Sequence, residues 1–346
     1  MARRLPFLLV GLVAAALVGV VVVAGGIYPQ TTSNPTPPPN GNLGPPTPGP
    51  NWSRMNPTIS PTNNSSMMAY LPMAGELLLV GSAGGCSASN TWTFSGGTWQ
   101  NVTSMVNPGP NPARGLGGLV YDSADGYLVL FGGSSPCGVY NDTWTFANNT
   151  WTRLPTAIAP PPLYGFAMTY DASDGYVLLT GGCCVSGEIS RETWTFQHGQ
   201  WTNLTQSPSP FVDLNSGMTY DATLGEVVFV GGYASGFVSQ ATWTFHNGTW
   251  LRVYPAVSPS NRAGMGLAYD GALKEDVLVG GYTKITKGVW TNLTDTWTYG
   301  RGHWQNLTSG LTASPSFASG PTLMAYDSAS KEIVMFLGYD QTWVFG

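Results

Sequence analysis

The chain has 346 residues, which is enough for one large all-β domain or for two ordinary domains. Hydrophobic residues make up 42% of it and can build a sizeable core, whereas charged residues make up 9%, against roughly 25% in an ordinary soluble domain. The net charge of −5 provides no basic surface, so nucleic acid is not expected as a partner, and the 45 glycines and 27 prolines favour short strands and tight turns over long helices.

The first predicted element is an apolar segment at the N-terminus. Arg3 and Arg4 precede an apolar run that reaches about Ile27. This run is longer than the roughly 7–15 residue core of a cleaved signal peptide and close to the ~20 residues of a spanning helix. The arginines favour a cytoplasmic N-terminus, which puts the rest of the chain outside the cell. We therefore predict that residues 1–27 are a signal anchor that crosses the cell membrane once; cleavage near Ala24 is the alternative.

The next segment is a linker. Residues 28–51 contain nine prolines, with asparagine, glycine and threonine between them. Such a composition buries nothing and favours extended polyproline conformations. At about 3.1 Å per residue the segment could separate a domain from the membrane by roughly 70 Å.

Residues 52–346 consist of repeats with a period near fifty residues. A typical repeat has a small-residue run ending in Tyr-Asp, an apolar run ending in Gly-Gly, a Thr-Trp pair, and a second Trp seven residues later. The Thr-Trp tryptophans are Trp92, Trp144, Trp194, Trp243, Trp297 and Trp343. The first tyrosine of each unit is, in order, Tyr70 in a degenerate copy and then Tyr121, Tyr170, Tyr220, Tyr269 and Tyr326.

Each repeat predicts four short strands, a to d. Strand a is the small-residue run, the Asp after Tyr favours a turn, and strand b is apolar throughout because both of its faces are covered. Strand c alternates around the Thr-Trp pair, and strand d starts at the second Trp. The sixth repeat stops after strand c, and residues 52–55 supply its missing strand d, which closes the ring.

These markers resemble kelch repeats, and the resemblance covers residues 52–346. It implies an all-β, six-bladed β-propeller whose blades are four-stranded antiparallel sheets. Strand d runs from the face with the a–b and c–d turns to the face with the b–c and d–a loops. A linker that enters at Trp52 therefore arrives on the first face, and we expect a binding site on the opposite, membrane-distal face.

Candidate ligand-binding residues belong to that distal face. In blades four, five and six a tyrosine occupies the position after the Gly-Gly step, which reads Leu-Gly in blade six, and an aromatic ring with a polar tip suits a sugar or a peptide. An arginine precedes strand a in blades two and five, and a tryptophan lies on the long b–c loop of blade five. Packing against neighbouring loops would explain these aromatic residues equally well. The candidates are Tyr233, Tyr282, Tyr339, Arg114, Arg262 and Trp290.

The cysteines all follow strand b, in blades one to three. Neighbouring b–c loops of an exported protein favour disulfide bonds across loops. The pairing among Cys86, Cys137, Cys183 and Cys184 stays open at this point, because four cysteines allow three connectivities. No metal site is expected from them.

Ten Asn-x-Ser/Thr sequences make this exported chain a candidate glycoprotein. Their abundance could also reflect a chain poor in charge and rich in asparagine and threonine. The favoured positions are Asn101, Asn148, Asn203, Asn247 and Asn306.

The function expected from these features is binding, in a surface module of a prokaryotic, archaeal-type envelope that recognises a glycan or a protein. The histidines His198, His246 and His303 all fall on c–d turns, so they cannot converge near the axis. Catalysis, a cofactor and a metal are therefore not expected. The alternatives are a carbohydrate-active enzyme, a copper enzyme similar to galactose oxidase, and a purely structural envelope protein.

Overall fold

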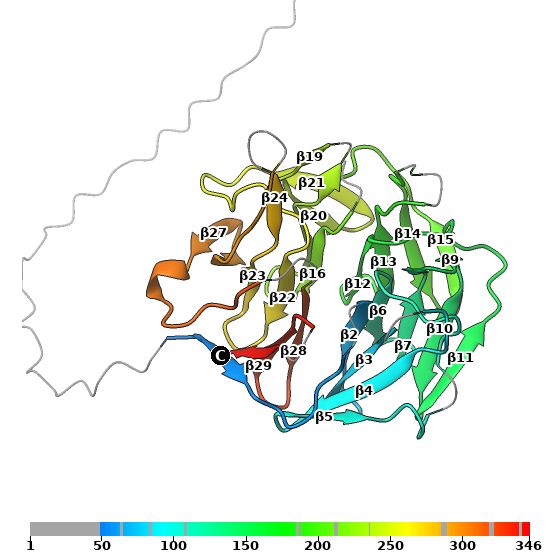
Figure 1. Ribbon diagram of the computed structural model, residues 1–346. Coiled ribbons are helices and arrows are strands. Elements are labelled where there is room, and N and C mark those ends of the chain that lie inside the picture. The colour runs from blue at the N-terminus through cyan, green and yellow to red at the C-terminus, as the bar shows by residue number, and fades with distance from the viewer. Residues whose placement is uncertain are drawn as a thin grey trace, which may run out of the picture. The chain divides into compact units, whose positions relative to one another are not determined.

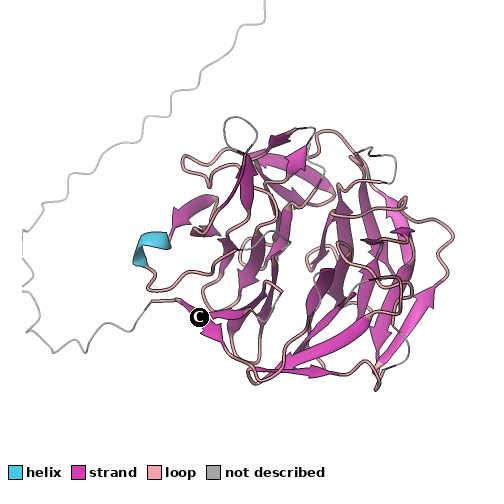
Figure 2. Cartoon of the chain, in the orientation of Figure 1, coloured by secondary structure: helices cyan, strands magenta, loops and turns pink. Residues whose placement is uncertain are grey.

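The computed structural model describes residues 49–346 except 63–64, 83–84, 107–108, 185–186, 188, 211–213, 235, 285–288, 318–321 and 339–340. The predicted anchor 1–27 and most of the linker 28–51 lie outside the described residues. Within the described part, no helix is long and apolar enough to cross a membrane. Pro48–Gly346 form one compact unit, a ring of six β-sheets (Figures 1 and 2).

The blades are four-stranded antiparallel sheets, as the repeat predicts. In blades one to three, strands a to d are β2 (Ser65–Leu71), β3 (Glu76–Ser82), β4 (Asn90–Ser95) and β5 (Thr98–Asn101); β6 (Gly118–Asp122), β7 (Tyr127–Phe131), β10 (Thr143–Ala147) and β11 (Thr150–Leu154); and β12 (Ala167–Asp171), β13 (Tyr176–Thr180), β14 (Thr193–Gln197) and β15 (Gln200–Asn203). The innermost strands β2, β6 and β12 contact one another in that order.

The second half of the ring repeats this plan. In blades four to six, strands a to d are β16 (Gly217–Asp221), β17 (Glu226–Val230), β20 (Thr242–His246) and β21 (Thr249–Val253); β22 (Gly266–Asp270), β23 (Glu275–Val279), β26 (Thr296–Gly300) and β27 (His303–Asn306); and β28 (Leu323–Asp327), β29 (Glu332–Phe336), β30 (Thr342–Phe345) and β1 (Trp52–Met55). A short 3-10 helix, η2 (Thr308–Gly310), follows β27.

Small hairpins extend three of the b–c loops. They are β8 (Ser134–Ser135) with β9 (Gly138–Val139), β18 (Tyr233–Ala234) with β19 (Phe237–Val238), and β24 (Tyr282–Lys284) with β25 (Trp290–Asn292). We call the end of the propeller that carries the b–c and d–a loops the loop face. The opposite end, which carries the a–b and c–d turns, is the turn face.

The ring closes through the N-terminal strand, as predicted. Strand β1 pairs with β30 so that Trp52 lies opposite Phe345, and Figure 1 shows β1 beside the C-terminal end of the chain. The two rings are 5.0 Å apart between centroids. Because β1 starts where β30 ends, the chain enters the propeller on the turn face, where Asn51 N donates to Gly346 O.

The Thr-Trp motif joins neighbouring blades. The indole N–H of each strand-d tryptophan donates to the hydroxyl of the threonine that starts the Thr-Trp pair of the preceding blade. Trp151 donates to Thr91 at 3.3 Å and Trp201 to Thr143 at 2.9 Å. The same bond closes the ring, since Trp52 donates to Thr296 and Trp99 to Thr342. The core lies between the blades, where the side chains of each strand b after its first residue are buried.

The Asp of the Tyr-Asp pair makes the predicted turn. In five blades its Oδ1 accepts backbone N–H groups two and three residues later, which is the Asx turn that this residue type favours. These residues are Asp122, Asp171, Asp221, Asp270 and Asp327.

Candidate functional site

Three of the predicted residues meet on the loop face. The ring of Trp290 in β25 lies 5.3 Å from Tyr282 in β24 and 5.6 Å from Tyr233 in β18, between centroids. We call Tyr233, Tyr282 and Trp290 the aromatic cluster. Trp290 is 47% exposed although it is a large apolar side chain, and both tyrosines are half-buried. The Nζ of Lys284 lies 5.9 Å from the Trp290 ring.

Tyr282 is fixed at the mouth of the central channel. Its hydroxyl accepts a hydrogen bond of 2.8 Å from Nδ2 of Asn215 in the neighbouring blade. Its ring lies against Gly264, where an added Cβ would come within 2.5 Å of the ring. Gly264 also has φ +66°, a conformation that favours glycine, and the close approach of the ring leaves no space for a larger residue. The sequence thereby fixes the position of this ring.

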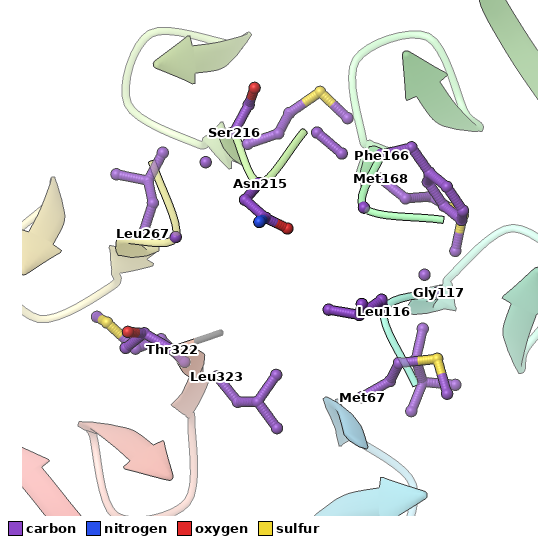
Figure 3. Close-up of a pocket in the computed structure, with 18 of the residues that line it drawn as sticks. Met67, Leu116, Gly117, Phe166, Met168, Asn215, Ser216, Leu267, Thr322 and Leu323 are labelled. Atoms are coloured by element: carbon purple, nitrogen blue, oxygen red, sulfur yellow. The ribbon is translucent and has the colours of Figure 1, made fainter. Parts of the chain in front are cut away.

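A cavity of about 190 Å³ opens beside the cluster on the propeller axis, and Figure 3 looks into it. We call it the loop-face cavity. Leu116, Asn215 and Gly264, which line its rim, have left-handed backbone conformations. Backbone bonds of 2.7–2.8 Å connect these rim residues through Gly165 from blade to blade. The Asn215 amide projects toward the open centre in Figure 3, and its hydrogen bond to Tyr282 places the aromatic cluster next to this opening.

The two candidate arginines are not available to a ligand, which corrects the sequence-based expectation. Arg114 and Arg262 are fully buried. Arg262 binds both carboxylate oxygens of Asp295, at 2.9 and 2.7 Å, and the carbonyl of Gly280 at 3.0 Å. Arg114 makes the equivalent bidentate contact with Asp142 and stacks on Tyr140. Through these bonds each guanidinium group connects the segment before strand a to the segment before strand c of the same blade.

The ion pairs set the charge of the two carboxylates. Burial alone would raise the pKa of Asp142, but its hydrogen bond and charge interaction with Arg114 hold that pKa below its usual value. Arg262 lowers the pKa of Asp295 against burial in the same way. Each carboxylate also accepts the indole N–H of the tryptophan two residues later, Trp144 or Trp297. Sequence reasoning missed these partners, although an Asp two residues before the Trp occurs in both blades with the arginine.

The other half of the loop face carries the cysteines. Cys86 and Cys137 form a disulfide between the b–c loops of blades one and two, with their Cα atoms 5.9 Å apart. Cys183 is buried, Cys184 is half-buried, and both carry thiols. A hydrogen bond with Cys183 raises the pKa of Tyr164. The structure thus contains one disulfide, Cys86–Cys137, and Cys183 and Cys184 are not joined to each other.

The remaining predicted residues are spread over the molecule. Tyr339 lies outside the described residues. The candidate glycosylation sites are all exposed. In blades one, three and five the Asn-x-Thr sequence forms a second Asx turn, in which the Asn Oδ1 accepts the Thr N–H at 2.9–3.0 Å and leaves the Nδ2 used in glycosylation out of the bond. These asparagines are Asn101, Asn203 and Asn306; Asn148 and Asn247 occupy left-handed positions of c–d turns.

The histidines lie exposed on the turn face, away from the aromatic cluster. His198 Nδ1 contacts Asp125 Oδ1 at 2.8 Å across blades two and three. His246 ends β20 and His303 begins β27, so both lie at c–d turns. Over the described ranges, no three His, Cys, Asp or Glu side chains gather in an arrangement that could hold a metal.

Comparison with solved structures identifies the architecture. The structure of YjhT, a six-bladed kelch-repeat propeller, matches with a TM-score of 0.62 and 14% sequence identity, over 84% of this chain and 94% of that chain. No protein-family model and no curated protein matches the chain. The resemblance to kelch propellers is therefore confirmed for the fold.

Proposed function

We propose that this protein is an exported, membrane-anchored recognition module that binds a glycan or a protein through its loop face. The observation that carries the proposal is the aromatic cluster of Tyr233, Tyr282 and half-exposed Trp290 beside the loop-face cavity. An exposed tryptophan supported by two tyrosines is the kind of residue set that dominates binding interfaces. Its neighbour Asn215 adds an amide at the same opening.

The rigidity of the surrounding frame supports binding. The b–c hairpin of blade five is paired through Tyr282, Thr283 and Lys284, and Tyr282 is held by Asn215 and Gly264. Such a platform loses little conformational entropy when it binds. Sugar rings and peptide side chains both stack on aromatic faces while polar groups satisfy the hydroxyl or amide groups around them.

The membrane arrangement is part of the same proposal. The chain enters the propeller on the turn face, so the loop face lies at the opposite end of the blades. With residues 1–27 as a single-pass anchor and 28–51 as a spacer, the loop face would point away from the bilayer. The proposed ligand is then a molecule outside the cell.

Binding, and not catalysis, is proposed from the side chains that the structure describes at this opening. The cluster contributes aromatic rings, Lys284 and the Asn215 amide. His198, His246 and His303 lie on the other face. A carbohydrate-active enzyme would need a reactive pair of groups at the loop face.

The test is a glycan and peptide array probed with the full-length protein and with a Tyr282→Ala/Trp290→Ala variant. We expect a defined set of ligands for the native protein and about 10- to 100-fold weaker binding for the variant, because aromatic anchors near the centre of an interface contribute most of its energy.

The matched control is Tyr254→Ala. Tyr254 is also an exposed aromatic residue, at 78%, but it lies on the d–a loop of blade four and stacks on Arg252. This variant should bind as the native protein does. Equal binding by the Tyr282/Trp290 variant, or loss of binding on replacing His198 and His246, would contradict the proposal.

A further inference from the structure

The axial channel has a second opening, on the turn face. A cavity of about 350 Å³ is lined there by the ends of the six strands a, and we call it the turn-face cavity. Five of the six repeat tyrosines line it, so its wall is mainly aromatic. These residues are Tyr70, Tyr121, Tyr170, Tyr269 and Tyr326.

The tyrosine rings reach from one blade to the next. The hydroxyl of Tyr220 lies 2.8 Å from Ser173 Oγ, and that of Tyr269 lies 2.8 Å from Thr223 Oγ1, each in the a–b turn of the preceding blade. An added Cβ at Gly271 would come within 3.0 Å of the Tyr326 ring. Tyr220 and Tyr269 thus span the gap to the preceding blade, and the five tyrosines that line the cavity form an aromatic wall around the axis.

An apolar layer separates this cavity from the one on the loop face. The residue two positions before each repeat tyrosine lines both cavities, so these six side chains form the partition between them. They are Met68, Leu119, Met168, Met218, Leu267 and Met324. A ligand in the turn-face cavity therefore contacts neither Trp290 nor Tyr282 at the loop face, and the two sites can be tested separately.

Negative charge is concentrated around the turn-face cavity. Twelve of the 18 acidic residues of the chain lie in the a–b turns or at the start of strand b, whereas the basic residues on these turns are Lys274 and Lys331. The twelve are Glu76, Asp122, Asp125, Asp171, Asp174, Asp221, Glu226, Asp270, Glu275, Asp276, Asp327 and Glu332.

Several of these carboxylates have unused hydrogen-bonding capacity. Asp122, Asp171 and Asp221 each follow a repeat tyrosine and are buried, and the Oδ2 atom of each has no hydrogen-bond partner among the described residues. The charge also reaches the aromatic wall: burial, and then the charges of Asp270 and Asp327, raise the pKa of Tyr326. Acidic residues therefore outnumber basic ones on the turns around this mouth, although burial raises the pKa of Asp122, Asp171 and Asp221.

We propose that the turn-face cavity is a binding site for an alkylammonium group, held against the aromatic faces of the tyrosines that line the cavity. Aromatic faces attract organic cations, and the attraction grows when the cation is removed from water. A cleft bordered by charges of one sign concentrates ions of the opposite sign. The apolar partition accommodates the alkyl groups of such a cation, which an inorganic ion does not have.

The ligand that fits is an ammonium group without a neighbouring anion. The acidic turns would repel the phosphodiester of a zwitterionic lipid headgroup. A free quaternary or primary amine should therefore bind more tightly than the same ammonium attached to phosphate.

The experiment measures binding to the full-length protein by calorimetric or NMR titration with choline, glycerophosphocholine and 3,3-dimethyl-1-butanol, the neutral carbon analogue of choline. We expect choline to bind at least about tenfold more tightly than the neutral analogue and more tightly than glycerophosphocholine, with an affinity that falls as salt is raised. Equal binding of the neutral analogue overturns the proposal, and so does an absence of choline binding. Tighter binding of glycerophosphocholine overturns the preference for a free ammonium.

Variants locate the site. Tyr170→Leu removes one aromatic face and should weaken choline binding by about tenfold, whereas Tyr170→Phe keeps the face and should bind within about twofold of the native protein. Glu226→Gln/Glu332→Gln removes charge without touching the tyrosines and should also weaken binding, so the proposal stays testable if Tyr170→Leu does not fold. Tyr282→Ala, at the other mouth, should leave choline binding unchanged. Loss of binding in Tyr282→Ala alone would overturn the assignment.

Discussion

At the loop face, the buried arginines Arg114 and Arg262 each have a bidentate carboxylate partner. At the turn face, buried Asp276 has neither oxygen hydrogen-bonded to any described residue. Burial, and then the charges of Asp221 and Glu275, raise its pKa well above the usual value. The same fold therefore pairs its buried ionisable groups at one end, and at the other it leaves a buried carboxyl without a hydrogen bond to any described residue.

This difference separates two uses of charge. The Arg262–Asp295 pair ties the loops of blade five beside the aromatic cluster, and the Arg114–Asp142 pair does the same within blade two, so removal of either should cost stability. The excess of carboxylates at the turn face costs stability as it stands, because like charges repel and a buried carboxyl must give up hydration. A cation in the turn-face cavity would offset part of that cost.

The largest effect is expected at the loop face. Arg262→Ala leaves Asp295 charged and without its partner, and should lower the free energy of unfolding by about 3–5 kcal/mol. Chemical denaturation of the native protein and the variant measures this. Arg252→Ala, which removes an exposed arginine, is the control and should change stability by less than about 0.5 kcal/mol. Arg262→Met/Asp295→Asn should recover most of the loss, because no lone charge remains and Trp297 keeps its acceptor. Equal stability of the native protein and Arg262→Ala would show that the Arg262–Asp295 pair does not stabilise the fold.

A smaller effect of opposite sign is expected at the turn face. The equivalent strand-b position holds buried Val177 in blade three and Val227 in blade four, so Asp276→Val should raise the free energy of unfolding by about 1–3 kcal/mol at pH 7.

The gain in Asp276→Val depends on pH. The folded state raises the pKa of Asp276. The free-energy cost of ionising this carboxyl in the native protein is therefore absent below the unfolded-state pKa of about 3.9. It grows as pH rises toward the folded-state pKa. The advantage of the variant should therefore be small near pH 4 and larger at pH 7, in denaturation curves at both values. A destabilised variant at pH 7 would mean that Asp276 has a stabilising role.

The smallest effect is expected for the partly exposed pair of His198 and Asp125 at the turn face. His198 is 70% exposed and contacts Asp125 at 2.8 Å. A double-mutant cycle with His198→Ala and Asp125→Ala should give a coupling of about 0.2–1 kcal/mol, less at high salt. A coupling above about 2 kcal/mol would indicate that this face is more rigid and less hydrated than its exposure suggests.

The repeat predicted most of the fold because it records contacts that recur in every blade. The period, the four strands, the Asx turn and closure by residues 52–55 all came from it. The contact between blades was harder to predict, since the Thr-Trp motif alone does not say that Thr143 accepts from Trp201 of the next blade. Such a bond joins repeats, and its two residues are far apart in sequence.

The site was predictable in part. The position after Gly-Gly indicated Tyr233 and Tyr282, and the long b–c loop indicated Trp290, which the structure brings together. The arginines misled because a charged residue was expected to face water, whereas Asp295 buries Arg262 from a position 33 residues later. No repeat signal marks that pairing, because it occurs in two blades and not in all six.

The closure of the ring has a consequence for synthesis. Strand β1 pairs with β30, so Trp52 has no partner until Phe345, 293 residues later in the chain, has been synthesised. At a translation rate of about 5–20 residues per second, that delay is roughly 15–60 s. During it, β1 leaves the ribosome without a blade to join, and five blades can form while the sixth cannot. A product truncated before β30 never acquires a closed ring and keeps unpaired strand edges exposed, which quality-control proteases can recognise. Closure by the first strand thus acts as a completeness check on each newly made chain.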